Sequence, residues 1–242
     1  MNCFARTSLG GVVTWKGHPG CQNAHDAMLD WLKDTVDHFL SPREATTGGN
    51  ILRGNLGESI AFCVSYWHDC NSFKAHAVNA WRPLNSQSLQ DIDIVWICFA
   101  RNPKDDYAIV QEVKTTSGAS LAYANALIAD YDKLYGTNLD LTLRSRFKPL
   151  KKDFLFKIGG KEGKNLSDRL IALVGGGPSS SPQIKLRPTL VHELVGTHPQ
   201  GKMTAIRNTL IGKGWTAASI EAWAIGLTDL DKRLHRLATG KN

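Results

Sequence analysis

The chain has 242 residues, of which 42% are hydrophobic, and it carries a formal net charge of +7 at pH 7. This apolar content can bury a core without disulfide or metal staples, and no segment approaches the roughly 20 apolar residues of a membrane-spanning helix. Because the N-terminus also lacks the features of a signal peptide, we expect a cytoplasmic protein without a membrane partner.

The first half of the chain predicts helices followed by strands. Residues 24–40 and 50–68 place apolar side chains at helical spacing. Residues 73–80 favour a strand weakly, and residues 90–100 favour one strongly because they are rich in Ile, Val and aromatic side chains. A short polar turn leads into a further strand at 107–116, so we expect the last two strands to form an antiparallel hairpin.

The second half predicts more helix than strand. Apolar spacing favours helices at 120–134 and 139–146, and two or three more between 203 and 237. Residues 169–174 read as a short buried strand. Residues 184–195 predict another strand, which Pro188 should confine to a sheet edge or split in two.

A run rich in Gly, Pro and Ser divides the chain. It predicts a linker at 175–183 between a core of residues 1–174, which includes N-terminal helices, and a mostly helical region at 184–242. The fold class we predict is α/β, with a mixed sheet flanked by helices on both faces and a small helical C-terminal region.

The predicted hairpin carries an unusual set of charged residues. Side chains two apart on a strand share a face, so Glu112 and Lys114 should point to the same side. Asp93 alternates with Ile92 and Ile94, which places an acid among residues expected to be buried. A buried acid is unfavourable without a partner. Hairpin pairing can supply one by bringing Asp93 opposite or diagonal to Glu112.

Two neighbouring carboxylates can share a divalent cation. Oxygen ligands without nearby His or Cys favour Mg²⁺ or Mn²⁺ over zinc, and Mg²⁺ usually retains several waters beside one or two carboxylates. The five cysteines are widely spaced and form neither a CxxC pair nor a compact His/Cys cluster, which also argues against a zinc site.

The order of these motifs resembles the PD-(D/E)xK nuclease superfamily of restriction, repair and phage-defence enzymes. The motifs are Glu58 in a helix (GNLGESIAF), Asp93 in an apolar strand (QDIDIVW), and Glu112-Val113-Lys114 in the next strand. The resemblance covers about residues 50–136, and its first motif reads Ile-Asp where the family name has Pro-Asp.

The resemblance implies a restriction-endonuclease-like fold and a set of site residues. Asp93 and Glu112 would bind Mg²⁺ or Mn²⁺, with the carbonyl of Val113 as a further ligand. Glu58 would act as an additional metal ligand or as an acid that positions water. Lys114 would orient or help deprotonate the attacking water and stabilise developing negative charge.

A basic segment between Arg144 and Arg169 favours a polyanionic partner. Its cations could neutralise several phosphates and make binding depend on salt. The candidate DNA-binding residues are Arg144, Arg146, Lys148, Lys151 and Lys152.

Three classes of function remain open on the sequence. The first is a metal-dependent endonuclease that hydrolyses DNA phosphodiester bonds in phage defence or restriction. The second is a catalytically silent nucleic-acid-binding module with the same fold. The third is an assembly subunit that docks a helicase or ATPase partner of a defence system.

Overall fold

Strand pairing organises the protein around one mixed sheet. The computed structural model describes residues 4–17, 49–72, 75–78, 93–118, 120–133, 148, 151–152, 154–173 and 183–233. The strands are β1 (Phe4–Leu9), β2 (Val12–Gly17), β3 (Ala75–Val78), β4 (Ile94–Cys98), β5 (Tyr107–Thr116), β6 (Ile184–Glu193) and β7 (Ala222–Leu227). They form a seven-stranded sheet in the order β1-β2-β7-β6-β5-β4-β3.

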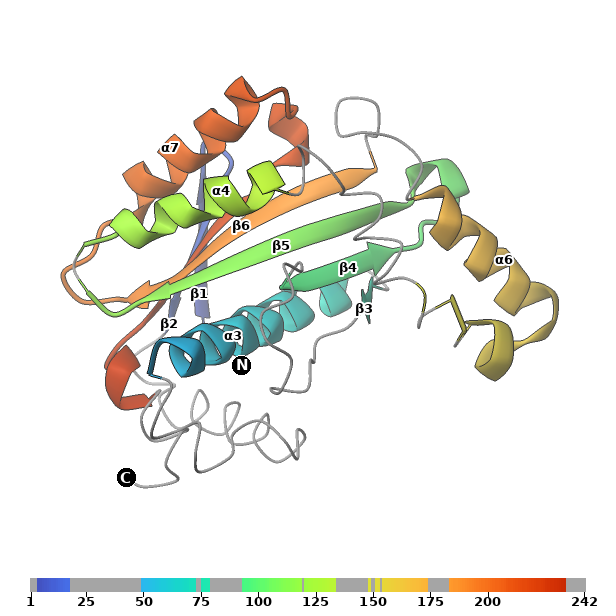
Figure 1. Ribbon diagram of the computed structural model, residues 1–242, viewed down its shortest axis with the longest axis horizontal. Coiled ribbons are helices and arrows are strands. Elements are labelled where there is room, and N and C mark those ends of the chain that lie inside the picture. Colours follow the sequence, from blue (N-terminus) through green and yellow to red (C-terminus); the bar gives the residue numbers. More distant parts are fainter. Residues whose placement is uncertain are drawn as a thin grey trace.

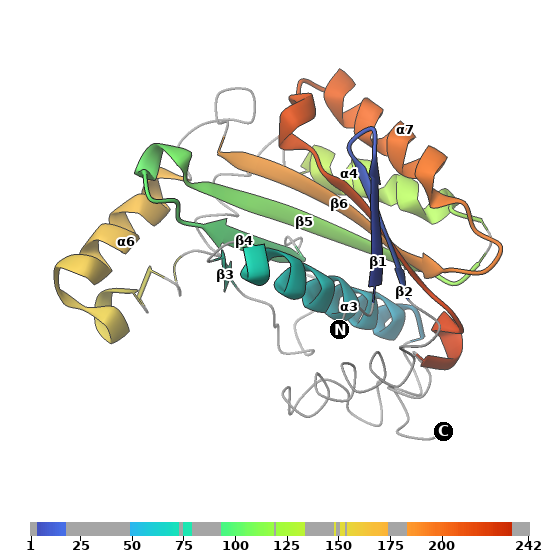
Figure 2. The same cartoon turned by 180° about the vertical axis from the view of Figure 1, so that it is seen from behind.

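The four central strands β2, β7, β6 and β5 are parallel, whereas β1, β3 and β4 pair antiparallel with their neighbours. One face of the sheet packs on α3 (Gly49–Ser72), and the other on α4 (Ala126–Lys133) and α7 (Pro199–Gly212). Figure 1 shows these helices above and below the sheet, and Figure 2 shows the same layers from behind. The α/β class and the mixed sheet between helices are therefore confirmed.

A separate helical arm lies beyond the turn that joins β4 to β5 (Figure 1). It consists of a π-helical turn at Phe154–Ile158 and α6 (Gly160–Ala172). Arg169 of α6 donates hydrogen bonds to Asp106 Oδ2 at 2.8 Å and to the carbonyl of Ala100 at 2.6 Å. Because Asp106 and Ala100 flank the turn, Arg169 fastens the arm to the β4–β5 hairpin.

Several predicted elements are present. The strand over 107–116 has the bounds of β5, the helix over 50–68 lies within α3, and β3 and β4 lie within 73–80 and 90–100. The helix expected at 120–134 forms as a short 3-10 turn at Ala122–Asn125 followed by α4. The helices predicted at 24–40 and 139–146 and most of the predicted linker lie outside the described residues.

The described part of the C-terminal region, residues 184–233, is not mostly helical, and this expectation is corrected. Both β6 and β7 are central strands of the sheet that contains β5. Pro188 is accommodated because the β6–β7 ladder begins at Thr189, with an isolated bridge from Leu186 to Ile220 on the other side of the proline. The tail between 203 and 237 thus contains a buried strand as well as helix.

One further expectation is wrong, and one hairpin was not predicted. Residues 169–173 do not form the strand expected at 169–174, because 169–172 belong to α6, whose buried Gly163, Ser167 and Leu170 recur at helical spacing. The N-terminal part contains the β1–β2 hairpin, which the sequence analysis did not predict. Its turn uses Gly10 and Gly11 at φ +57° and +79°, a conformation that glycine adopts readily.

Within the described residues, none of the helices has both the length and the apolar content needed to cross a bilayer.

Candidate active site

The β4–β5 pairing brings Asp93 next to Glu112. Ile94 pairs with Gln111, so the antiparallel register places Asp93 opposite Glu112 one step further along. Asp93 lies in a bend immediately before β4, and its Oδ2 accepts a hydrogen bond from the N–H of Val113 at 2.7 Å. The predicted hairpin is confirmed, and with it the proximity of these two acids.

Glu112 is a buried carboxylate with incomplete hydrogen bonding. Its residue is 3% exposed, and among the described residues no group donates a hydrogen bond to its Oε1. Burial raises the pKa of Glu112 well above its usual value, and the charges of Asp93 and Asp130 raise it further, while Lys114 opposes them. The carboxyl group of Glu112 therefore needs added positive charge nearby to stay ionised, and it otherwise takes up a proton.

Lys114 is paired with an acid that the sequence analysis missed. Its Nζ lies 2.6 Å from Oδ2 of Asp130 on α4, and both side chains are largely buried. Burial alone would lower the pKa of Lys114, but the hydrogen bond to Asp130 and the nearby charges of Asp93 and Glu112 produce a net increase. Lys114 is therefore a protonated ammonium at neutral pH.

Glu58 reaches the region from α3, on the opposite face of the sheet from α4. Gly57 lets the helix approach β5 closely, because a Cβ at this position would overlap Oγ1 of Thr115. Of the charges that act on the pKa of Glu112, Glu58 has the smallest influence. The structure thus brings Asp93, Glu112 and Lys114 together more closely than it joins Glu58 to them.

Hydrogen bonds fix the strand that carries Glu112 and Lys114. The hydroxyl of Tyr131 on α4 accepts the N–H of Glu112 and donates to the carbonyl of Val110, each at 3.1 Å. On the other face, the side-chain carbonyl of Gln111 accepts from Ser65 and Trp96, and its amide donates to Thr189. This network joins α3, β4, β5 and β6 beneath the site, so β5 is held in position from both faces.

The carboxylates of Asp93 and Glu112 are the candidate metal ligands of the site. Among the described residues, no group of three or more His, Cys, Asp or Glu side chains is arranged to hold a metal ion. Asp93 and Glu112 nevertheless fit a hard cation that keeps most of its waters, since Mg²⁺ commonly binds through one or two carboxylates. The unsatisfied Oε1 of Glu112 and the surrounding acids support this fit.

Val113 has a defined place, but its proposed role is untested. Its side chain lies in the core on the α3 face, and its N–H is occupied by Asp93. Its carbonyl as a metal ligand remains a prediction.

Three of the five predicted basic residues are among the described ones. Lys148 and Lys152 are exposed and Lys151 is partly exposed, whereas Arg144 and Arg146 are outside the described residues. The arm that follows them in sequence lies at the turn end of the hairpin, and Lys114 lies toward the far end of β5 (Figure 1).

A signal for Asp130 was present in the sequence. Leu127 and Tyr131 are buried and four residues apart on α4. Asp130 adjoins this stripe, so an acid was available on the buried side of the helix. Its pairing with Lys114 depends on how α4 packs across β5, which residue spacing does not reveal.

No protein-family model matches this sequence, and a search of curated proteins finds no relative. Function is therefore inferred from the geometry of the residues described above.

Proposed function

We propose that the protein is a Mg²⁺-dependent endonuclease that hydrolyses DNA phosphodiester bonds. One observation carries the proposal: Asp93 lies opposite Glu112 just before the start of β4, with the ammonium of Lys114 on the same face of β5. Two carboxylates and an ammonium are groups that metal-assisted hydrolysis of a phosphodiester can use. The resemblance to PD-(D/E)xK nucleases agrees with this order of acids and lysine, and we propose a restriction-endonuclease-like fold on that basis.

The chain's own residues have separable roles in this proposal. Asp93 and Glu112 would hold Mg²⁺ or Mn²⁺, which supplies a Lewis acid for the scissile phosphate and lowers the pKa of a bound water. Lys114, being protonated, would donate a hydrogen bond to the developing negative charge and orient the water, and would not act as a base. Asp130 positions that ammonium. Glu58 would contribute water-mediated contacts from α3.

A role in phage defence or restriction is part of the same proposal, as is a helicase or ATPase partner. Both follow from the resemblance alone, because the described residues contain no surface that specifies such a partner by its chemistry.

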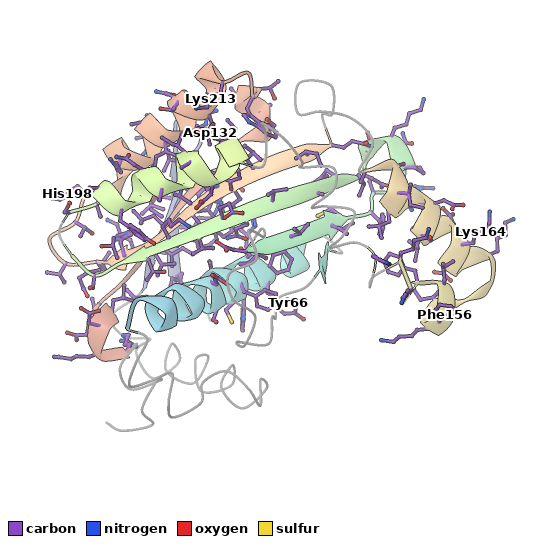
Figure 3. All side chains as sticks on the ribbon, viewed as in Figure 1. Tyr66, Asp132, Phe156, Lys164, His198 and Lys213 are labelled. Carbon is purple, nitrogen blue, oxygen red and sulfur yellow. The ribbon has the colours of Figure 1, made fainter. Side chains whose placement is uncertain are left out.

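Plasmid nicking tests the activity. The wild type should nick supercoiled DNA with Mg²⁺ and not with EDTA. Asp93→Ala and Lys114→Ala should each lose about 100-fold or more of the rate. Lys213→Ala is the matched control, because Lys213 also pairs with an acid on α4, Asp132, at 2.8 Å but on the surface (Figure 3). Equal nicking by Lys114→Ala and Lys213→Ala would refute the assignment.

A catalytically silent DNA-binding module is the second candidate. It is favoured by the ion pair that already occupies Lys114 and by the lack, among described residues, of a three-residue ligand set. Metal-independent DNA binding without nicking by the wild type would select it.

A further inference from the structure

Phe156 is an apolar side chain placed almost wholly in water. It is 82% exposed, on the π-helical turn of the arm. Leu155 and Ile158 of the same turn are also exposed. Figure 3 shows Phe156 and Lys164 on the arm, well away from the sheet. Burying such a ring is favourable, so its exposure leaves free energy available for binding a partner.

The turn that presents Phe156 is firmly supported. Phe154 is buried, and its ring centre lies 5.8 Å from that of Phe99. Gly163 of α6 packs so closely that a Cβ there would overlap the carbonyl oxygen of Phe154. Arg169 adds the hydrogen bonds to the β4–β5 hairpin. Phe156 is therefore directed outward by a scaffold that is joined to the same hairpin as the candidate active site.

Lysines outnumber acids among the exposed charged side chains of the arm that carries Phe156. Exposed lysines on the arm and the segment preceding it are Lys148, Lys152, Lys157, Lys161 and Lys164. Among the described residues of the arm the opposing acids are Glu162 and Asp168, and Asp168 already pairs with Lys164 at 3.4 Å. An aromatic ring among cations complements a base attached to phosphates, because the base stacks on the ring while lysines neutralise the backbone.

We propose that the arm binds single-stranded nucleic acid, with Phe156 stacking on an unpaired base and the arm lysines contacting phosphates. The inference rests on the proposed nuclease function and names its substrate class. The strand from Tyr107 to Glu112 is about 17 Å long at the usual rise per residue. One substrate that reaches both the active site and the arm must therefore span at least about 17 Å.

Fluorescence anisotropy in EDTA tests this without cleavage. The probes are oligothymidylates of about 20 and about four nucleotides and a duplex of the longer length. Phe156→Ala should weaken binding of the long single strand about tenfold, the loss expected for one stacked base. The short strand should bind the wild type more weakly than the long one does, because it contacts fewer lysines. Phe156→Trp should bind as the wild type does. Tyr123→Ala, which removes another exposed aromatic ring, is the control and should have no effect.

The salt dependence of binding tests the lysines of the same arm. Replacing Lys157, Lys161 and Lys164 with Gln should lower the dependence of log affinity on log salt by about 0.7 for each phosphate that the variant no longer neutralises. Unchanged affinity in Phe156→Ala and an unchanged salt dependence in the lysine variant would overturn the proposal. So would Phe156-dependent binding to phosphatidylserine vesicles without binding to DNA, which would make the arm a membrane-surface element.

The two proposals fail separately. Lys114→Ala should lose cleavage, whereas Phe156→Ala should lose affinity for the long strand. Cleavage that depends on Lys114 together with binding that ignores Phe156 overturns only the role of the arm. Phe156-dependent binding by a wild type that never cleaves overturns only the nuclease assignment.

Discussion

Glu112 is buried beside other acids. Its ionised carboxylate should therefore reduce the stability of the metal-free protein. Its pKa is raised in the folded state, mainly by burial. The folded protein therefore binds this proton more tightly than the unfolded chain does. The stability from neutral Glu112 is complete below the ordinary pKa of Glu and is lost as pH rises through the raised value.

Substitution of Glu112 by Gln should therefore stabilise the metal-free protein at neutral pH. Gln has the shape of the protonated acid but cannot ionise. The melting temperature of Glu112→Gln in EDTA should exceed that of the wild type at about pH 8, and the difference should disappear near about pH 4, where unfolded Glu is protonated. Glu162→Gln, at an exposed acid on the arm, should show no such pattern. A destabilised Glu112→Gln at the higher pH would contradict this account.

Tyr131 affects the site through the backbone of β5. Tyr131→Phe would leave the N–H of Glu112 and the carbonyl of Val110 without this hydroxyl partner. We expect the free energy of unfolding to fall by about 1–3 kcal/mol, measured by urea titration. Tyr123→Phe, at an exposed position, is the control. Equal stabilities of the two variants would show that the hydroxyl of Tyr131 does not secure the strand.

At the scale of elements, α3 can approach β5 only because residue 57 lacks a side chain. Gly57→Ala would place a methyl group against Thr115, and we expect a loss of about 1–3 kcal/mol of stability together with reduced cleavage. Gly54→Ala in the same helix meets nothing within 4 Å and should be neutral or stabilising by up to about 1 kcal/mol. Chemical unfolding of both variants tests the contact. If the two variants show the same change in the free energy of unfolding, close packing of α3 against β5 does not position Glu58.

The elements that could be predicted have strong local patterns. Strand β5 begins after a polar turn, and the paired strand β4 is rich in Ile, Val and Trp. Strand β7 was missed because every residue of Ala222–Leu227 is buried, and a short apolar run does not distinguish a central strand from a core helix. Helix α6 was mistaken for a strand at its end because Ile171, on the exposed side, makes the apolar run look continuous.

Some residues of the candidate site could also be predicted from the sequence, and others could not. Asp93, Glu112 and Lys114 follow from strand alternation and a hairpin, which are local features. Asp130 and Tyr131 depend on α4 packing across β5, and the outward position of Phe156 depends on Phe154 being anchored beneath it. Such contacts between elements leave no spacing in the sequence by which they could be predicted.

At the scale of the whole molecule, the two ends of the β4–β5 hairpin carry different groups of residues. The acids and Lys114 lie at one end, and Arg169 fastens the arm to Asp106 at the other. Arg169→Leu leaves the buried carboxylate of Asp106 without its guanidinium, so we expect the melting temperature to fall and amide exchange in α6 to accelerate. Lys164→Leu, which removes an exposed pair with Asp168, should change neither. Slow exchange in α6 of Arg169→Leu would mean that other contacts hold the arm.

The most direct test of the central claim is the position of a Mn²⁺ ion in anomalous scattering from crystals of the protein, with Glu112→Gln crystals treated identically. The account predicts an ion bound between the carboxylates of Asp93 and Glu112 in the wild type and none in the variant. An ion bound elsewhere, or the same occupancy in both crystals, would contradict it.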